Sequence, residues 1–304
     1  MSYRWPEFST LFGKLSDRVG FDSKSYFFRQ YIRFTLRNLL ARKQINPFVE
    51  FINQNPRRIA LFSKHIGAAH WLLCKDFLNK RFSHNQRAQS IAYNLEVLET
   101  ILSDELFSRL LQGEEIELLK LEEDLSCIFV FNGALEEGFL AIKIVYKSQV
   151  VYHLSFGFVE KNRQVALLIA CIQGGGNGEN LRAQIKEVTK KLFGLRPQNF
   201  LIEITRYFAQ YIQAQSLLGV CQEQQIRYSH FGKKRYFAEY NQMWEECGGI
   251  LKTQYYDLSE VKQKDLSEIP SQKRSMYKKR FALLDDSKEK VFARLKEIGV
   301  KECL

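Results

Sequence analysis

The sequence predicts an α+β protein in which a helical N-terminal region precedes a mixed sheet with flanking helices. Two observations support this fold class. In the first third of the chain, apolar residues recur at the three-to-four spacing of helices, and from about residue 125 they alternate as in half-buried strands. The spacing divides the chain into a helical region at 1–120, a mixed α/β domain at 121–285 and a helical tail at 286–304.

The composition is that of a folded protein with a basic surface. Apolar residues make up 45% of the chain and charged residues 26%, close to the globular average. The net charge is +11, from 45 Lys and Arg against 34 Asp and Glu. This surplus either keeps the protein soluble or favours anionic partners, such as phosphorylated cofactors, nucleic acid or anionic lipids.

Cysteine spacing and hydropathy indicate the compartment. The six cysteines include no C-x-x-C pair, so the sequence predicts no metal site and no thioredoxin-like chemistry. Free thiols are most simply kept in a reducing compartment. The longest apolar run, Val165 to Ile172, is far shorter than the ~20 residues that span a bilayer, and the first residues lack the apolar core of a signal peptide. We therefore expect a cytoplasmic protein.

The first long helix is predicted over residues 23–42. Its apolar residues recur at three-to-four spacing: Phe28, Ile32, Leu36, Leu39 and Leu40. Arg29, Arg33 and Arg37 are four residues apart and share one face. Residues 1–43 carry nine Lys or Arg against three Asp or Glu. The pattern is typical either of a surface helix with a solvated charged face or of a helix lying on an anionic membrane through these arginines.

Prolines predict a turn-rich connection after that helix. Pro47 and Pro56 interrupt the helical pattern, which returns at 59–77 and at 83–111.

Two hairpins are predicted in the middle of the chain. Alternating residues at 140–146 and 152–158 predict two strands joined by a turn at 147–149. A second turn at 160–163 leads into 164–172, a continuous apolar strand that suits a central position buried on both faces.

Alternating helices and strands complete the predicted fold. Helices are expected at 180–193 and from Pro197, which suits a first helical position. A strand at 217–221, a helix at 239–247 and a strand at 250–258 follow.

A glycine-rich loop, Gln173-Gly-Gly-Gly-Asn-Gly178, separates the buried strand from the next helix. Glycines let the backbone approach a ligand closely, and the free N–H groups at a helix start favour anions. The dinucleotide fingerprint fails because Glu179 stands where its third glycine belongs, and the P-loop fails because no Lys-Ser or Lys-Thr follows. The spacing that fits is Q-x-x-G-x-G, at Gln173, Gly176 and Gly178.

This loop resembles the pyrophosphate-binding turn of GCN5-related N-acetyltransferases, which likewise follows a central strand. The resemblance implies an acetyltransferase-like sheet, acyl-CoA as cofactor, and a binding set of Gln173, Gly174, Gly176, Gly178 and Asn180. Two features depart from that family: two predicted helices, not one, follow the loop, and Glu179 adds negative charge beside it. A tight structural turn is the alternative interpretation.

Candidate catalytic residues follow from the same resemblance. Amine acylation by a thioester needs a base for the amine proton and an acid for the departing thiolate. Glu223, at the end of the strand near Leu217, is the candidate base, and Tyr240, on the next predicted helix, is the candidate acid. A solvated loop residue and a core ring are the respective structural alternatives.

Longer segments resemble the VirK/YbjX family of bacterial proteins, from about residue 34 to 285. They read NPFVEFINQNPR at 46–57, GLRPQNF at 194–200, MWEECGG at 243–249 and IPSQKRSMYKKRFALLD at 269–285, together with QG at 173–174. The family is associated with the cell envelope, virulence and resistance to antimicrobial peptides, and has no established activity. One departure is Gln225, which stands where the family pattern has a histidine.

Basic segments rich in aromatic residues occur at 232–236 and 273–281. Their composition suits a helix whose long basic side chains cover an apolar surface, contacts to phosphate, or nucleic-acid binding. Together the two resemblances imply an envelope-supporting bacterial protein with an acyl-CoA-dependent acyltransferase-like domain, peripheral to the inner membrane. A non-enzymatic membrane-surface or adaptor protein is the alternative, and nucleic-acid binding ranks third.

Overall fold

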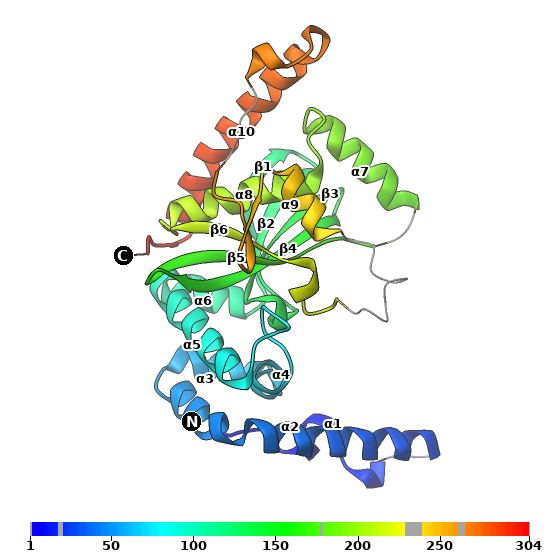
Figure 1. Cartoon of the computed structure of the whole chain (residues 1–304), viewed down its shortest axis with the longest axis vertical. Helices are drawn as coiled ribbons and strands as arrows, with labels where there is room; N and C mark the ends of the chain where they lie inside the picture. The colour runs from blue at the N-terminus through cyan, green and yellow to red at the C-terminus, as the bar shows by residue number, and fades with distance from the viewer. Residues whose placement is uncertain (1, 18–20, 177–178, 229–238, 261–264, 304) are drawn as a thin grey trace.

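The computed structural model describes residues 2–17, 21–176, 179–228, 239–260 and 265–303 (Figure 1). Its centre is an eight-stranded sheet in the order β1-β2-β3-β4-β5-β6-β8-β7. The strands are β1 (Ile116–Glu122), β2 (Leu125–Phe131), β3 (Leu140–Tyr146), β4 (Gln149–Lys161), β5 (Gln164–Gly174), β6 (Ser216–Val220), β7 (Ile250–Lys252) and β8 (Tyr255–Asp257). β5 and β6 run parallel and the other described pairs antiparallel, so the predicted α+β class with a mixed sheet is confirmed.

The described helices precede the sheet or flank it. They are α1 (Phe8–Phe12), α2 (Phe21–Asn53), α3 (Pro56–Lys64), α4 (Ala68–Cys74), α5 (His84–Ile101), α6 (Asp104–Leu111), α7 (Glu179–Lys191), α8 (Pro197–Tyr211), α9 (Tyr240–Glu246) and α10 (Ser271–Glu297). The local sequence determines where several helices begin. Ser83 and Gln86 form a capping box at α5, and Asn55 caps α3, whose first residue is Pro56.

The two predicted hairpins are confirmed. β3 and β4 pair with Ile142 opposite Leu154, and their turn is the dipeptide Lys147-Ser148. Both turn residues have left-handed φ angles, 50° and 61°, as in a two-residue turn that matches the strand twist.

Helices cover both faces of the sheet. On β4, the ring of Phe156 packs 5.3 Å from that of Phe208 on α8. The next residue, Gly157, faces α5, where an added Cβ would lie 2.6 Å from Asn94 Oδ1. Consecutive strand residues point to opposite faces, so α8 and α5 lie on opposite sides of the sheet.

The predicted break at Pro47 is wrong. Pro47 lies inside α2, which runs on to Asn53. A proline in a helix interior costs ~3 kcal/mol, but the residues that follow it pack into the core, where Phe48 and Ile52 are buried. Burial of two large apolar side chains offsets a cost of that size.

Two other predicted elements are each divided in the structure. The helix expected at 83–111 is divided into α5 and α6 by Leu102 and Ser103, and the strand expected at 250–258 is the β7–β8 hairpin. β1 crosses the boundary expected at 120, and α10 crosses the one expected at 285. One contiguous cluster of buried apolar residues runs from α2 through the sheet to Val291 and Leu295 of α10.

Candidate functional site

The parallel strands β5 and β6 separate toward their carboxyl ends. Their pairing extends from Ala166 opposite Ser216 to Ile169 opposite Gly219. β6 then ends at Val220, whereas β5 continues to Gly174. Ligands of open α/β sheets bind in the crevice beyond such strand ends, where the chain turns away in different directions.

Two side chains of α9 hold the strands apart. The Trp244 indole N–H donates a hydrogen bond to the Val220 carbonyl on β6, at 2.9 Å. The Tyr240 hydroxyl accepts the Ile172 N–H on β5 at 3.0 Å and lies 3.0 Å from the Ile172 carbonyl oxygen. Because residues four apart share a helix face, one turn of α9 bridges the ends of both strands.

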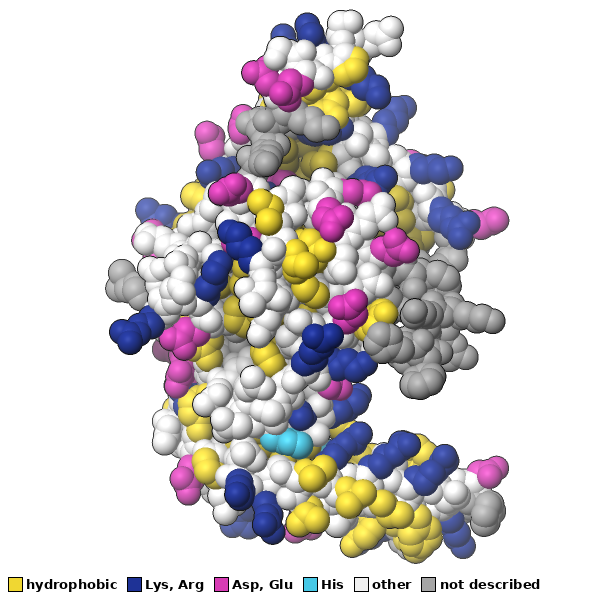
Figure 2. Space-filling view, viewed as in Figure 1, with side chains coloured by type: hydrophobic (Ala, Val, Ile, Leu, Met, Phe, Trp, Pro, Cys, Tyr) yellow, Lys and Arg dark blue, Asp and Glu magenta, His cyan; other side chains and the backbone are white. Residues whose placement is uncertain are grey.

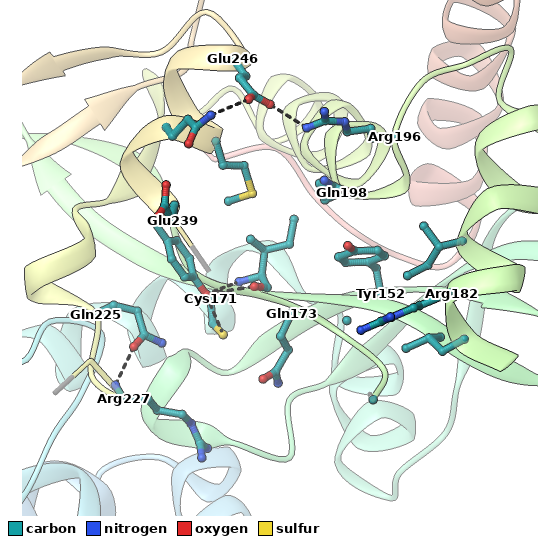
Figure 3. A pocket seen from close by; sticks show the side chains of 18 residues that line it. Tyr152, Cys171, Gln173, Arg182, Arg196, Gln198, Gln225, Arg227, Glu239 and Glu246 are labelled. Carbon is teal, nitrogen blue, oxygen red and sulfur yellow. Dashed lines mark hydrogen bonds and ion pairs between the residues drawn. The ribbon is translucent and has the colours of Figure 1, made fainter. Parts of the chain in front are cut away.

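The separated strands open into a cleft of about 1130 Å³ (Figure 3). This exceeds the ~300–1,000 Å³ typical of small-molecule pockets, so an extended ligand would fit. Its walls come from β4, β5, the glycine turn (here Gly174 and Gly176), the start of α7, the start of α8, the segment after η3 (Gln222–Gln224), and α9.

Several of the residues predicted to bind a ligand line this cleft. Gln173, Gly174 and Gly176 of the predicted binding set are among its lining residues, as is Tyr240, the candidate acid. Gly178 lies outside the described residues. The glycine spacing groups the loop residues in the sequence. In the structure, the described loop residues line the same cleft as α9.

Other predicted residues lie elsewhere. Asn180 and Glu179 are exposed at the start of α7 and are not among the described residues that line the cleft. Glu223, the candidate base, is exposed on η3 and is likewise not among these lining residues.

Cations that the glycine pattern did not identify line the cleft. Arg182, in the first turn of α7, makes no ion pair with any residue in the described part of the chain. Arg196, before α8, pairs with Glu246 of α9 at 2.9 Å. Figure 3 shows that they enter the cleft from separate elements. The sequence could have identified Arg182 as a candidate phosphate contact, because it lies one helical turn after the glycine turn.

The inner end of the cleft is lined by a protonated thiol. Burial, and secondarily the nearby Glu137 carboxylate, raises the pKa of Cys171 to about 12. Its Sγ lies 3.3 Å from the Tyr240 hydroxyl. A thiol with such a pKa carries almost no thiolate at neutral pH and is a poor nucleophile.

A buried carboxylate lies behind this thiol. Glu137, in η2 (Leu135–Glu137), is fully buried and accepts a hydrogen bond from Ser155 at 3.1 Å. The Arg227 guanidinium, which lines the cleft, pairs with Glu137 at 2.7 Å. Removing one partner of such a pair leaves an uncompensated buried charge. Arg227 therefore supports the fold at the cleft wall.

The second basic segment anchors a helix. Arg280 of α10 donates to the Phe193 carbonyl at 2.8 Å and lies over the Tyr277 ring, 4.3 Å from its centroid. Arg274 donates to the Ile269 carbonyl. The other basic segment, at 232–236, lies outside the described residues.

No helix among the described residues is both long and apolar enough to cross a membrane. The described residues also contain no cluster of three or more His, Cys, Asp or Glu side chains placed to hold a metal ion.

Comparison with known proteins shows which family this is. The family model described as a protein of unknown function (DUF535) matches residues 23–293. An uncharacterized protein of Haemophilus influenzae (strain ATCC 51907 / DSM 11121 / KW20 / Rd) is 33% identical over 290 residues, covering 94% of this chain and 93% of the relative. Membrane protein LapB of Mannheimia haemolytica is 32% identical over 228 residues, covering 73% of this chain and 93% of the relative.

A more distant relative carries a name expected from the sequence motifs. The uncharacterized protein YbjX of Escherichia coli (strain K12) is 27% identical over 224 residues, covering 70% of this chain and 68% of the relative. No solved structure matches the chain significantly. The chain belongs to the DUF535 family, with YbjX of Escherichia coli among its distant homologues.

Proposed function

We propose that the cleft binds a phosphorylated acyl donor of the acyl-CoA class and that the chain transfers its acyl group to an amine. The observation that carries this proposal is the position of the cleft. It lies where the parallel strands β5 and β6 part, and the glycine turn and the start of α7 form one of its walls. Such a site presents backbone N–H groups and a helix N-terminus to an anion.

The charges of the cleft support phosphate binding at that wall. Arg182 stands in the first turn of α7 beside the glycine turn, and Arg196 lies at the start of α8. Because Arg182 has no acidic partner among the described residues, phosphate binding would not have to break an existing ion pair. Guanidinium groups bind phosphate through two parallel hydrogen bonds, which suits a pyrophosphate.

The inner end of the cleft supports direct transfer. Because the Cys171 thiol stays protonated, it would not carry the acyl group as an intermediate. The amine nitrogen would instead attack the thioester carbonyl carbon, forming the N–C bond and breaking the C–S bond. A base takes the amine proton, and the Tyr240 hydroxyl gives up its hydrogen bond to the Ile172 carbonyl and passes its proton to the departing thiolate.

We propose a different base from the one expected from the sequence. Glu223 is exposed and outside the described lining, whereas Glu239, immediately before α9, lines the cleft beside Tyr240. A general base must reach the proton that it removes, directly or through one water. The geometry therefore favours Glu239 for this role.

The biological setting is also part of the proposal. One relative is named a membrane protein, LapB. With the motifs shared with VirK/YbjX proteins, this supports a role in cell-envelope integrity, virulence or antimicrobial-peptide resistance. The acceptor would then be an amine that is accessible from the cytoplasm.

A second candidate is a non-enzymatic binding module. The Tyr240 hydroxyl bonds Ile172 on the strand edge, which is what a purely structural wedge would do. In that case the cleft would still hold a phosphorylated ligand but no acyl transfer would follow.

The experiment is isothermal titration of the full chain with coenzyme A, acetyl-CoA and inorganic pyrophosphate. We expect acetyl-CoA to bind, and Arg182→Glu to weaken it by roughly tenfold or more, because a hydrogen bond to a charged group contributes about 1.5–3 kcal/mol. Lys186→Glu is the matched control: Lys186 is exposed one turn further along α7 and is not among the described residues that line the cleft.

Each outcome decides between the candidates. Binding followed by release of free thiol with an amine supports the transferase. Binding without any thiol release across a pool of amines supports the binding module. No binding of coenzyme A, or equal loss in Arg182→Glu and Lys186→Glu, would reject the cleft assignment.

A further inference from the structure

The outer face of α2 carries an exposed apolar stripe. Its large side chains are more than half accessible to solvent: Phe28 52%, Ile32 56%, Leu36 53%, Leu39 56% and Leu40 68%. These are the residues whose spacing predicted the helix, yet they do not face the core. With 100° between successive residues, Phe28, Ile32, Leu36 and Leu39 fall within a sector of about 80°. An apolar surface of this length signals a binding surface.

The opposite face of α2 packs against the rest of the protein. There the ring of Phe8 from α1 packs 5.1 Å from Phe27 and 5.5 Å from Phe34. Further along the same face, Ala41 is fully buried. Figure 1 shows α1 and α2 extending together as an arm beside the rest of the molecule. The stripe is therefore a second apolar face, which the described fold leaves uncovered.

Between its two ends the stripe is flanked by basic residues, and the acidic residues of α2 near it, Asp22 and Glu50, lie beyond those ends. Residues 23–49 contain no Asp or Glu and six basic residues: Lys24, Arg29, Arg33, Arg37, Arg42 and Lys43. On the helix, Arg29 and Arg33 border the stripe on one side, and Lys24 and Arg42 border it on the other. Figure 2 shows apolar and basic side chains next to each other along this arm.

The three arginines first grouped on one face have different roles. Arg29 and Arg33 are exposed. Arg37 is half-buried, with its guanidinium 5.6 Å from the centroid of the Trp71 ring on α4. Arg37 thus fixes the arm to the body, and Arg29 and Arg33 remain available to a partner.

We propose that α2 lies flat on an anionic phospholipid surface, independently of what the cleft does. The apolar stripe would enter the boundary between headgroups and acyl chains, and the bordering cations would contact lipid phosphates. Charge complementarity selects this occupant. A stripe flanked along its length by cations matches an anionic bilayer, whereas a second copy of the same arm would bring mostly like charges together.

The wild-type protein tests the lipid dependence. The full chain is sedimented with vesicles of phosphatidylcholine alone and of phosphatidylcholine mixed with phosphatidylglycerol. We expect binding to the anionic vesicles alone. Raising salt from ~0.1 M to ~1 M should weaken it, because the Debye length falls from about 10 Å to about 3 Å.

Matched pairs of variants test the residues. Arg29→Glu with Arg33→Glu should reduce partitioning at least roughly 25-fold, about fivefold for each cation near an anionic surface. Its control is Lys278→Glu with Lys279→Glu, an equal charge change at exposed positions of α10. Leu36→Ser with Leu39→Ser should reduce partitioning at least roughly tenfold. Its control is Ile250→Ser with Leu251→Ser, which are 50% and 55% exposed on β7.

The outcomes separate a bilayer from other occupants. All substituted side chains are exposed, and circular dichroism checks that each variant is folded. Equal sedimentation with neutral and anionic vesicles, or equal losses in test and control variants, would overturn the proposal. So would a dimer in sedimentation velocity that Leu36→Ser with Leu39→Ser dissociates while vesicle binding is unchanged, since the stripe would then join two copies of the chain.

Discussion

The hydroxyl of Tyr240 satisfies both backbone groups of Ile172. It accepts the N–H at 3.0 Å and lies 3.0 Å from the carbonyl oxygen, on the side of β5 that β6 no longer pairs. A neighbouring strand would ordinarily supply these bonds. Tyr240 thus lets β5 border an open cleft without leaving its Ile172 groups unpaired.

Replacing Tyr240 by Phe removes this hydroxyl and keeps the buried ring. We expect the free energy of unfolding to fall by about 1–3 kcal/mol, the cost of leaving buried polar groups unsatisfied. If acyl transfer occurs, the rate should also fall with little change in acetyl-CoA affinity. Urea unfolding and calorimetry measure the two effects. Tyr277→Phe on α10, whose hydroxyl makes no hydrogen bond within the described residues, is the control, and equal stability of both variants would contradict this account.

The glycine turn offers a pair of substitutions that separates binding from folding. An added Cβ at Gly174 would meet no atom closer than 3.9 Å, whereas one at Gly175 would lie 1.8 Å from the Val150 carbonyl oxygen. We expect Gly174→Val to fold normally and to lose acetyl-CoA binding at least roughly tenfold, because the side chain enters the cleft. Gly175→Ala should instead lower the melting temperature.

Gly176→Val is a less decisive test than Gly174→Val. Gly176 has open space around it, but its φ of +155° is one that other residues rarely adopt. A loss of binding in Gly176→Val could come either from backbone strain or from a lost ligand contact, and the two causes would not be separated. Full affinity in folded Gly174→Val would show that the turn does not contact the ligand.

His70 should make the base of the arm sensitive to acid. Asn38 Oδ1 accepts the Trp5 indole N–H at 3.2 Å and lies 3.2 Å from His70 Nδ1, which must therefore donate to it. The buried Nε2 has no hydrogen-bond partner among the described residues. Burial, and secondarily the charge of Arg37, lowers the pKa of His70 to about 4.

The direction of this pH effect on stability follows from the difference between the folded and unfolded pKa of His70. Between pH ~6.5 and ~4, His70 binds a proton in the unfolded state but not in the folded state. The free energy of unfolding is therefore highest above this window and decreases as pH falls through it. From pH 7 to pH 5 we expect a loss of about 2 kcal/mol from this group. His70→Gln, which can still donate to Asn38 but cannot titrate, should lose correspondingly less in urea unfolding. Parallel pH profiles for the two proteins would contradict the assignment.

The central fold was predictable from local patterns. Alternation at 140–146 and 152–158 predicted the β3–β4 hairpin, since one face of each strand is richer in buried residues. The β7–β8 hairpin was missed because its turn, Thr253-Gln254, contains none of the usual turn residues. The helix break predicted at Pro47 is wrong for a different reason. Long-range packing of α2 overrides the local helix propensity of proline.

The candidate site was predictable only in part, because it is assembled from distant segments. The spacing of Gln173 and its glycines marks one wall. Arg196 and Glu239 reach the cleft through the path of α8 and α9, which no local pattern encodes. The exposed stripe on α2 shows a similar limit, because periodicity identifies an apolar face without indicating what covers it.

The identity of the base can be decided by two single substitutions. Glu239 lines the cleft beside Tyr240, whereas Glu223 is exposed on η3 outside the described lining. We expect Glu239→Gln to slow thioester-dependent acylation by about 10²- to 10⁴-fold, the usual contribution of a general base. Acetyl-CoA affinity should stay near that of the wild type, because the proton is removed from the acceptor. Glu223→Gln should retain most of the rate. The reverse result, with Glu223→Gln inactive and Glu239→Gln active, would return the role to Glu223 and would require η3 to approach the cleft when the acceptor binds.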